Sequence, residues 1–184
     1  MRITSGLLRG RQIQVPRGIR PTQDRVRQAI FSALGESVVG ARVLDLFAGS
    51  GSLGLEAISR GAARVIWVEV DPAAASIIRR NVAGLCTGAG SVVCADVFLW
   101  LRRAHLEPFD LVFADPPYDP HRSYRWLEKT LPLLEERSIV RNGGLLIFEM
   151  SASEKAEGRP GWDLIWDRRY GGTRVSMFRR QQIE

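Results

Sequence analysis

A glycine-rich turn that joins an apolar segment to an amphipathic one constrains the fold of this chain most. Residues 42–47 (Arg-Val-Leu-Asp-Leu-Phe) predict a buried strand, and residues 52–60 predict a helix that ends near Gly61. Between them, residues 49–54 read Gly-Ser-Gly-Ser-Leu-Gly and match G-x-G-x-x-G, a pattern whose glycines let the backbone approach a ligand closely. A strand, this turn and a helix in succession predict a parallel α/β sheet that binds a ligand at the carboxyl ends of its strands.

The alternation of strands and helices continues along the chain. Four further strands are predicted at residues 64–69, 91–95, 109–114 and 145–150. Helices are predicted between them at residues 71–85, 97–103 and 124–134, the last interrupted by Pro132. A turn is expected at residues 142–144, and two final strands at 162–169 and 173–178 predict a hairpin. We therefore expect an α/β domain over residues 21–184, a Rossmann-like, doubly wound sheet of seven strands with a partly antiparallel edge.

The N-terminal residues 1–20 are expected to form a small basic extension. Residues 2–15 alternate loosely, with glycines between them, and predict a short hairpin. Thr22 is expected to cap a helix that ends near Gly35, with an apolar stripe formed by Val26, Ile30, Phe31 and Leu34.

The positive charge of the chain is concentrated in this N-terminal region. The net charge is +6, and residues 1–27 carry seven arginines against one acid, whereas the remaining 19 basic and 19 acidic residues cancel. Guanidinium groups bind phosphates through paired hydrogen bonds, so the region predicts a nucleic-acid partner. A GC-rich genome would explain why arginine outnumbers lysine, but it would not explain why the arginines cluster.

Membrane and metal-centred functions are not expected. No apolar stretch has the length of a membrane span and no signal peptide is recognisable, so a cytoplasmic protein is expected. Cys86 and Cys94 are too few for a disulfide framework, and with two histidines they do not make a metal-ligand cluster.

Three acids at or near predicted strand ends indicate what the glycine turn binds. Glu69 lies twenty positions after Gly49 and would accept hydrogen bonds from both ribose hydroxyls of an adenosine-bearing ligand. Asp45, within the first strand, would repel a pyrophosphate and instead suits a cation such as the ammonium group of S-adenosylmethionine. Asp96 would accept a hydrogen bond from an adenine amine or cap the following helix, and the two roles are compatible.

A second motif, Asp115-Pro116-Pro117-Tyr118, ends the predicted strand 109–114. Two consecutive prolines prevent both strand pairing and an immediate helix, so a carboxylate and a phenol ring are held at the edge of the sheet. Such a turn suits a planar base with an exocyclic amine. It is equally compatible with an ordinary strand-ending turn.

Taken together, these motifs resemble a known family. Residues 45–51, Val68-Glu69 and Asp115-Pro116-Pro117-Tyr118 are similar to the class I S-adenosylmethionine-dependent methyltransferases that act on exocyclic amines. Residues 2–6, 20–27 and 54–62 narrow the resemblance to the bacterial 16S rRNA guanine-N2 methyltransferases that modify guanine 966 of the small subunit. The resemblance covers nearly the whole chain, but residues 151–160 and the C-terminal hairpin carry no motif of the family.

The resemblance implies a role for each matching residue. The cofactor S-adenosylmethionine would contact Asp45, Phe47, Gly49, Ser50, Gly51, Glu69, Val70, Asp96 and Val97. In catalysis, Asp115 and the carbonyl of Pro116 would accept hydrogen bonds from the guanine amine, and Tyr118 would stack on the base. A monomer would bind 16S rRNA, free or in a 30S assembly particle, through Arg2, Arg9, Arg11, Arg17, Arg20, Thr22 and Arg25.

Other functions stay open on the sequence. A DNA adenine-N6 or cytosine-N4 methyltransferase would share the Asp115 motif, although 184 residues leave little room for a domain that reads base edges. A non-catalytic rRNA-binding module would share the arginines but would not bind S-adenosylmethionine. A dinucleotide oxidoreductase would share the glycine turn, but Asp45 disfavours it.

Overall fold

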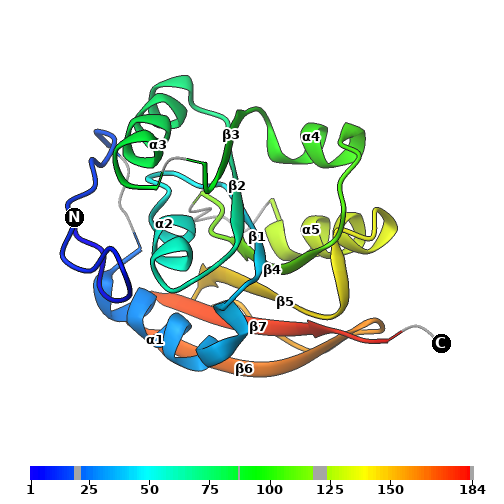
Figure 1. Ribbon diagram of the computed structural model, residues 1–184. Helices are drawn as coiled ribbons and strands as arrows, with labels where there is room; N and C mark the ends of the chain where they lie inside the picture. Colours follow the sequence, from blue (N-terminus) through cyan, green and yellow to red (C-terminus); the bar gives the residue numbers. More distant parts are fainter. Residues whose placement is uncertain (19–21, 87, 118–123, 183–184) are drawn as a thin grey trace.

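The computed structural model describes residues 1–18, 22–86, 88–117 and 124–182, and it shows a sheet with helices on both faces (Figure 1). The seven strands lie in the order β3-β2-β1-β4-β5-β7-β6. Strands β1 to β5 pair in parallel, whereas β7 runs antiparallel to both β5 and β6. The predicted doubly wound α/β fold with an antiparallel edge is therefore confirmed.

The strands begin and end close to their predicted positions. They are β1 (Arg42–Leu46), β2 (Arg64–Glu69), β3 (Gly90–Cys94), β4 (Phe109–Ala114), β5 (Val140–Ser151), β6 (Trp162–Tyr170) and β7 (Thr173–Arg180). The helices are α1 (Asp24–Leu34), the 3-10 turn η1 (Gly35–Val38), α2 (Ser52–Ser59), α3 (Pro72–Leu85), α4 (Val97–Arg103) and α5 (Trp126–Glu136). Within the described part of the chain, none of these helices is long and apolar enough to cross a bilayer.

The two faces of the sheet bury two apolar clusters. Successive residues of a strand point to opposite faces, so Val43 packs with residues of α1, α2 and α3, and Leu44 packs with residues of α4 and α5. Because helices cover both faces (Figure 1), a ligand reaches this sheet at the ends of its strands.

Two elements differ from their predictions. β5 continues through residues 142–144, where a turn is expected, because a shift in its pairing with β4 and a φ of +75° at Gly143 accommodate the glycines as a bulge. Pro132 does not interrupt α5, which runs on to Glu136. The missing backbone donor of Pro132 is offset by the burial of Leu131 and Leu134 on the same helix.

The N-terminal segment, residues 1–18, packs on α2 and α3. Its predicted hairpin has one antiparallel bridge, between Arg2 and Gln12, and Ile13 is buried in the apolar cluster of α1 and α2. The side chain of Asn81 in α3 exchanges two hydrogen bonds of 2.9 Å with the backbone of Gln14. The predicted boundary of the extension, between residues 20 and 21, lies outside the described residues and stays a prediction.

A buried carboxylate, Glu56 of α2, anchors the start of the chain. Its oxygens accept hydrogen bonds from Thr4 N (2.9 Å), Thr4 Oγ1 (2.6 Å) and Ser5 N (3.0 Å). The Nε atom of Arg60 lies 3.0 Å from Oε1, and the Nε atom of Arg27, a residue only 1% exposed, lies 3.3 Å from Oε2. Two guanidinium partners and three hydrogen bonds are what allow a carboxylate to be fully buried.

Candidate active site

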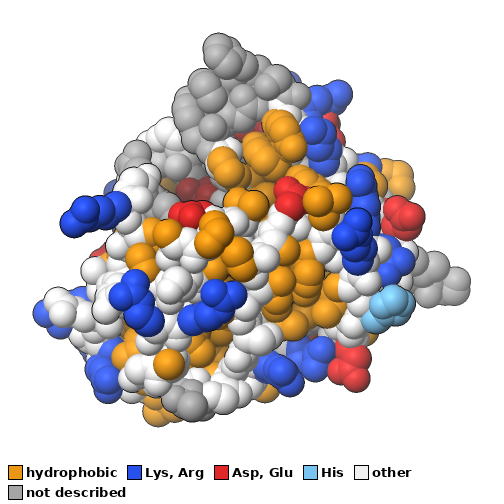
Figure 2. All heavy atoms as spheres, turned by 90° about the horizontal axis from the view of Figure 1, so that it is seen from above, with side chains coloured by type: hydrophobic (Ala, Val, Ile, Leu, Met, Phe, Trp, Pro, Cys, Tyr) orange, Lys and Arg blue, Asp and Glu red, His pale blue; other side chains and the backbone are white. Residues whose placement is uncertain are grey.

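A cavity of about 590 Å³ lies at the carboxyl ends of β1, β2, β4 and β5. The strand order reverses between β1 and β4, and such switch points are where doubly wound sheets bind ligands. Figure 2 shows acidic side chains set among apolar ones near the centre of one face of the molecule, with lysine and arginine side chains around them.

The cavity brings together most of the residues predicted to bind the cofactor. Those that line it are Asp45, Phe47, Gly49, Ser50, Glu69, Val70, Asp96 and Val97. Gly51 is the exception: a Cβ atom there would lie 3.0 Å from Ile78 Cγ2, so this glycine allows α3 to pack against the turn. Its predicted contact with the cofactor stays a prediction.

Glu69, at the end of β2, holds the glycine turn in place. Its Oε2 accepts a hydrogen bond from Gly49 N (2.7 Å), and its Oε1 accepts one from Asp71 N (2.8 Å). Each carboxylate oxygen has a further lone pair, so Glu69 can also accept hydrogen bonds from hydroxyl groups in the cavity.

An aromatic wall bounds the cavity near Asp96. The ring of Phe47 lies edge-on to Phe98 (6.0 Å) and to Trp126 (5.3 Å), and the Phe98 and Trp126 rings are nearly parallel. Phe47 has a φ of +56°, a conformation that costs a bulky residue free energy and is found mostly at functional sites. Asp96 caps α4 by accepting a hydrogen bond from Leu99 N (2.9 Å), so its predicted capping role is confirmed and its role toward adenine stays a prediction.

Asp45 and Asp115 make the cavity acidic next to the glycine turn. Burial raises the pKa of Asp45 well above its ordinary value, against a 2.9 Å hydrogen bond from Gly54 N, and the charges of Asp115 and Glu69 raise it further. Burial likewise raises the pKa of Asp115 to about 6, and a hydrogen bond from Thr22 opposes that rise. A cationic ligand would relieve the repulsion among these carboxylates.

The lining suits S-adenosylmethionine, the cofactor implied by the resemblance. Val70 is an apolar side chain that is 61% exposed at the cavity, and it offers a surface against which a planar base can pack. Glu69 offers acceptors for ribose hydroxyls, and Asp45 offers a negative charge for a cationic group. The donor and acceptor chemistry of the cavity therefore fits the group.

Thr22 is used differently from its predicted role as a helix cap. Gln23 occupies the N-cap position of α1 and makes no side-chain capping bond. The Thr22 side chain is 93 residues away from Asp115 in sequence, yet its Oγ1 donates to Asp115 Oδ2 at 3.1 Å. The predicted cap is therefore wrong because the hydroxyl is turned toward the cavity, and a contact between Thr22 and RNA stays a prediction.

Two of the predicted catalytic residues, Asp115 and Pro116, line the cavity together with Pro117. Tyr118 lies outside the described residues, as does Arg20 of the predicted RNA-binding set. Their predicted roles stay predictions.

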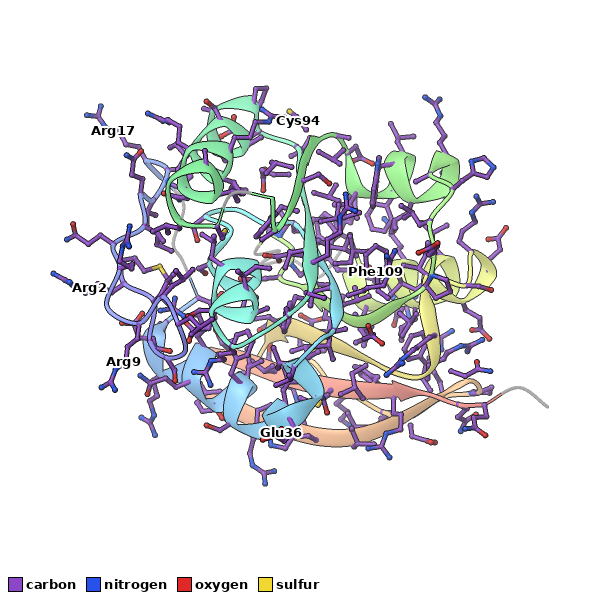
Figure 3. All side chains as sticks on the ribbon, viewed as in Figure 1. Arg2, Arg9, Arg17, Glu36, Cys94 and Phe109 are labelled. Carbon is purple, nitrogen blue, oxygen red and sulfur yellow. The ribbon has the colours of Figure 1, made fainter. Side chains whose placement is uncertain are left out.

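The remaining predicted RNA-binding residues, Arg2, Arg9, Arg11, Arg17 and Arg25, are all exposed. Figure 3 shows Arg2, Arg9 and Arg17 pointing outward from the N-terminal segment, away from the body of the protein. Arg17 precedes Gly18, which lines the cavity, so the basic segment extends to the edge of the site.

The β5 side of the cavity was not predicted. Glu149 follows Phe148, which pairs with Ala114, so Glu149 and Asp115 occupy matching positions at the ends of neighbouring strands. The sequence held a signal for Glu149, because the carboxyl end of the strand predicted at 145–150 lies at the same edge of the sheet. Further unpredicted lining residues include Gln23, Val26, Trp126, Met150, Ser151, Glu154, Gly172 and Thr173.

Comparison with known proteins finds similarity along nearly the whole chain. Residues 1–179 match the family described as conserved hypothetical protein 95. The chain is 37% identical over 187 residues to a protein of Escherichia coli strain K12 named ribosomal RNA small subunit methyltransferase D, with 98% of this chain and 90% of that protein covered. A protein of the same name from Haemophilus influenzae is 34% identical over 176 residues, with 93% and 89% covered. The solved structure of yhhF from Escherichia coli superposes with a TM-score of 0.88 at 36% identity and covers 98% of each chain.

Proposed function

This chain belongs to the ribosomal RNA small subunit methyltransferase D family, and on that premise we propose that it methylates the N2 amine of a guanine in 16S rRNA. Enzymes of this family methylate rRNA and use S-adenosylmethionine as the methyl donor. The choice of an exocyclic amine is supported by one observation, that Asp115 shares its cavity with Asp45 and Glu69. An acceptor for the amine and acids for the cofactor therefore face the same space.

The residues on the β1–β2 side hold the cofactor. Bound S-adenosylmethionine supplies an electrophilic methyl group on a sulfonium centre. Glu69 accepts hydrogen bonds from its ribose, Asp96 accepts one from its adenine amine, and Asp45 pairs with its ammonium group. Val70 and Val97 pack on the adenine ring and exclude water from it.

Asp115 orients the target amine. Thr22 donates to Oδ2. We assign one amine hydrogen to Oδ1 and the other to the Pro116 carbonyl. Holding both hydrogens draws the nitrogen toward tetrahedral geometry and frees a lone pair that is otherwise delocalised into the base. Positioning of this kind can supply on the order of 7 kcal/mol or more. Transfer leaves the nitrogen with one proton too many, and Asp115, with its pKa raised to about 6, can accept that proton on Oδ1.

The N-terminal segment holds the rRNA. A guanine must leave its stack to enter the cavity, at a cost of a few kcal/mol. Phosphate contacts by the exposed arginines offset this cost and fix the position of the RNA. We propose that a cytoplasmic monomer acts in this way on free 16S rRNA or on a 30S assembly particle.

The test is methyl transfer from labelled S-adenosylmethionine to unmodified 16S rRNA and to 30S particles, with the product nucleoside identified by mass spectrometry. We expect N2-methylguanosine from the wild type and at least a hundredfold lower turnover from Asp115→Asn, with S-adenosylmethionine binding retained in a calorimetric titration. Asp163→Asn, at an exposed aspartate on the edge strand β6, is the matched control and should match the wild type. Undiminished turnover in Asp115→Asn would refute the assigned role.

The same assay separates the proposed substrate from the alternatives. Methylation of duplex DNA at adenine N6 or cytosine N4, with rRNA left unmodified, would favour a DNA methyltransferase. Tight rRNA binding without S-adenosylmethionine binding would favour a non-catalytic module. Comparison of free rRNA with 30S particles, and sedimentation of the active protein, test the proposed particle and the proposed monomer.

A further inference from the structure

Thr22 joins the basic N-terminal region to the catalytic motif, and we infer that it is a positioning residue that orients the Asp115 carboxylate and keeps it charged for the target amine. The inference rests on the function proposed above, because it assigns Thr22 a role in the step that Asp115 performs. Neither the resemblance nor the comparisons assign this role.

The geometry supports a specific contact. Thr22 is 7% exposed and lines the cavity, and its Oγ1 donates to Oδ2 of Asp115 at 3.1 Å. Among the described residues, this is the hydrogen bond that the Asp115 side chain receives. It restrains the carboxylate plane, which would otherwise rotate about the Cβ–Cγ bond, and it engages Oδ2 rather than Oδ1.

The hydroxyl is not needed for the local fold. Threonine just before a helix ordinarily caps it, but here α1 begins at Asp24 with Gln23 at the N-cap and without any side-chain capping bond. A cap is commonly worth about 1 kcal/mol, and the chain forgoes it. A threonine that does not cap the adjacent helix, with no gain in the stability of the helix, indicates that its hydroxyl has a functional role.

The surroundings of Asp115 explain why a donor is required. Burial raises the pKa of Asp115 and so favours its protonated form, whereas the hydrogen bond from Thr22 favours its charged form. The titratable groups that share the cavity are Asp45 on β1, Glu69 at the end of β2, Asp96 before α4, and Glu149 and Glu154 at and beyond the end of β5. On the α1 side, Asp24 and Arg25 are exposed, and Arg27 is paired with Glu56 and Asp24. No lysine or arginine among the described residues lines the cavity. The Thr22 hydroxyl therefore provides the stabilisation of the Asp115 charge that a basic side chain provides in other sites.

The test is the pH dependence of kcat/KM for rRNA methylation in Thr22→Val and Thr22→Ser. Valine keeps the shape of threonine but removes the hydroxyl, so the acid limb of the profile should move upward by about one pH unit, since a hydrogen bond to a charged group is commonly worth about a tenfold change. At neutral pH the displaced limb by itself lowers kcat only about twofold, and the loss of carboxylate positioning should bring the total fall to about tenfold, with the KM for rRNA unchanged. Thr22→Ser keeps the donor and should restore the wild-type profile, and Thr22→Ala should reproduce the displaced limb if valine perturbs folding.

Thr4→Val is the matched control. Thr4 lies in the same N-terminal region and donates to a different carboxylate, Glu56, so its replacement weakens the fold without touching Asp115. Its acid limb should coincide with that of the wild type. The inference would be overturned if the acid limb of the pH profile lay at the same pH for the wild type, Thr22→Val and Thr22→Ala. It would also be overturned if Thr4→Val moved the acid limb as far as Thr22→Val does. An inactive wild type would instead refute the proposed function.

Discussion

Replacement of Glu56 by glutamine tests whether the buried ion network fixes the N-terminal segment. In the wild type, Oε1 receives Thr4 Oγ1, Ser5 N and Arg60 Nε, and Oε2 receives Thr4 N and faces Arg27 Nε. Every group around the carboxylate is a donor. If the glutamine NH2 group took the position of Oε2, it would therefore face two other donors, Thr4 N and Arg27 Nε. If it took the position of Oε1, it would face three, Thr4 Oγ1, Ser5 N and Arg60 Nε.

The expected loss is large because the charge that remains is buried. Arg27 is 1% exposed, and after the substitution its anionic partner is Asp24, whose side chain is 62% exposed and screened by water. Removing one member of a buried pair commonly costs about 3–5 kcal/mol. Native domains are stable by about 5–15 kcal/mol, so Glu56→Gln should consume a large fraction of the stability.

Urea unfolding followed by circular dichroism measures this loss, and amide hydrogen exchange at Thr4 and Ser5 shows whether the N-terminal segment is released. Glu107→Gln is the control, because its ion pair with Arg42 (3.1 Å) is solvent-exposed and should cost less than about 1 kcal/mol. The released segment carries the exposed arginines, so rRNA affinity should fall while S-adenosylmethionine binding persists. Equal losses for the two variants, or unchanged exchange at Thr4 and Ser5, would refute the reasoning.

Three other predictions concern the site and the fold. Asp115→Asn removes a carboxyl group whose folded pKa is raised to about 6; a raised pKa stabilises the fold at low pH, and that contribution is lost as the pH rises through about 6. The variant should therefore be more stable than the wild type at pH 8, by about 1–3 kcal/mol, and not at pH 4 in urea unfolding, and equal stability at pH 8 would contradict the burial argument. Gly54→Ala would place a Cβ atom 2.2 Å from Trp67 Nε1 and should lower the free energy of unfolding by about 1–3 kcal/mol. Gly84→Ala, with open space around it, is the control and should raise the free energy of unfolding slightly. An unchanged free energy of unfolding in Gly54→Ala would show that α2 can move off β2. Arg9→Gln combined with Arg11→Gln should reduce the slope of log affinity for rRNA against log salt by about 1–2, as measured by filter binding, and an unchanged slope would remove these two arginines from the interface.

Much of the fold follows from signals that are local in the sequence. Apolar runs such as residues 109–114 predict strands, and Asp71-Pro72 predicts the start of α3, because a capping carboxylate and a proline act on backbone groups one turn away. The glycine turn is equally local, since its conformation depends on residues without a side chain. These features place an acid and an Asp-Pro-Pro turn at one edge of the sheet, and the cavity lies there.

Local signals failed where burial or long-range contacts changed the outcome. Pro132 is a helix breaker by propensity, yet α5 continues through it because its neighbours are buried. Residues 142–144 favour a turn, yet pairing on the sheet draws them into β5 as a bulge. In both cases packing outweighed a local preference of a few kcal/mol.

The sequence by itself determined the strand and helix order, the glycine turn and the Asp115 motif. The tertiary structure alone decided that Thr22 bonds to Asp115, that Glu56 binds the start of the chain, and that Glu149 lies beside Asp115. The physical reason is distance along the chain. Hydrogen bonds and ion pairs between residues some 50 to 90 positions apart depend on strand order and register, which no short stretch of sequence encodes.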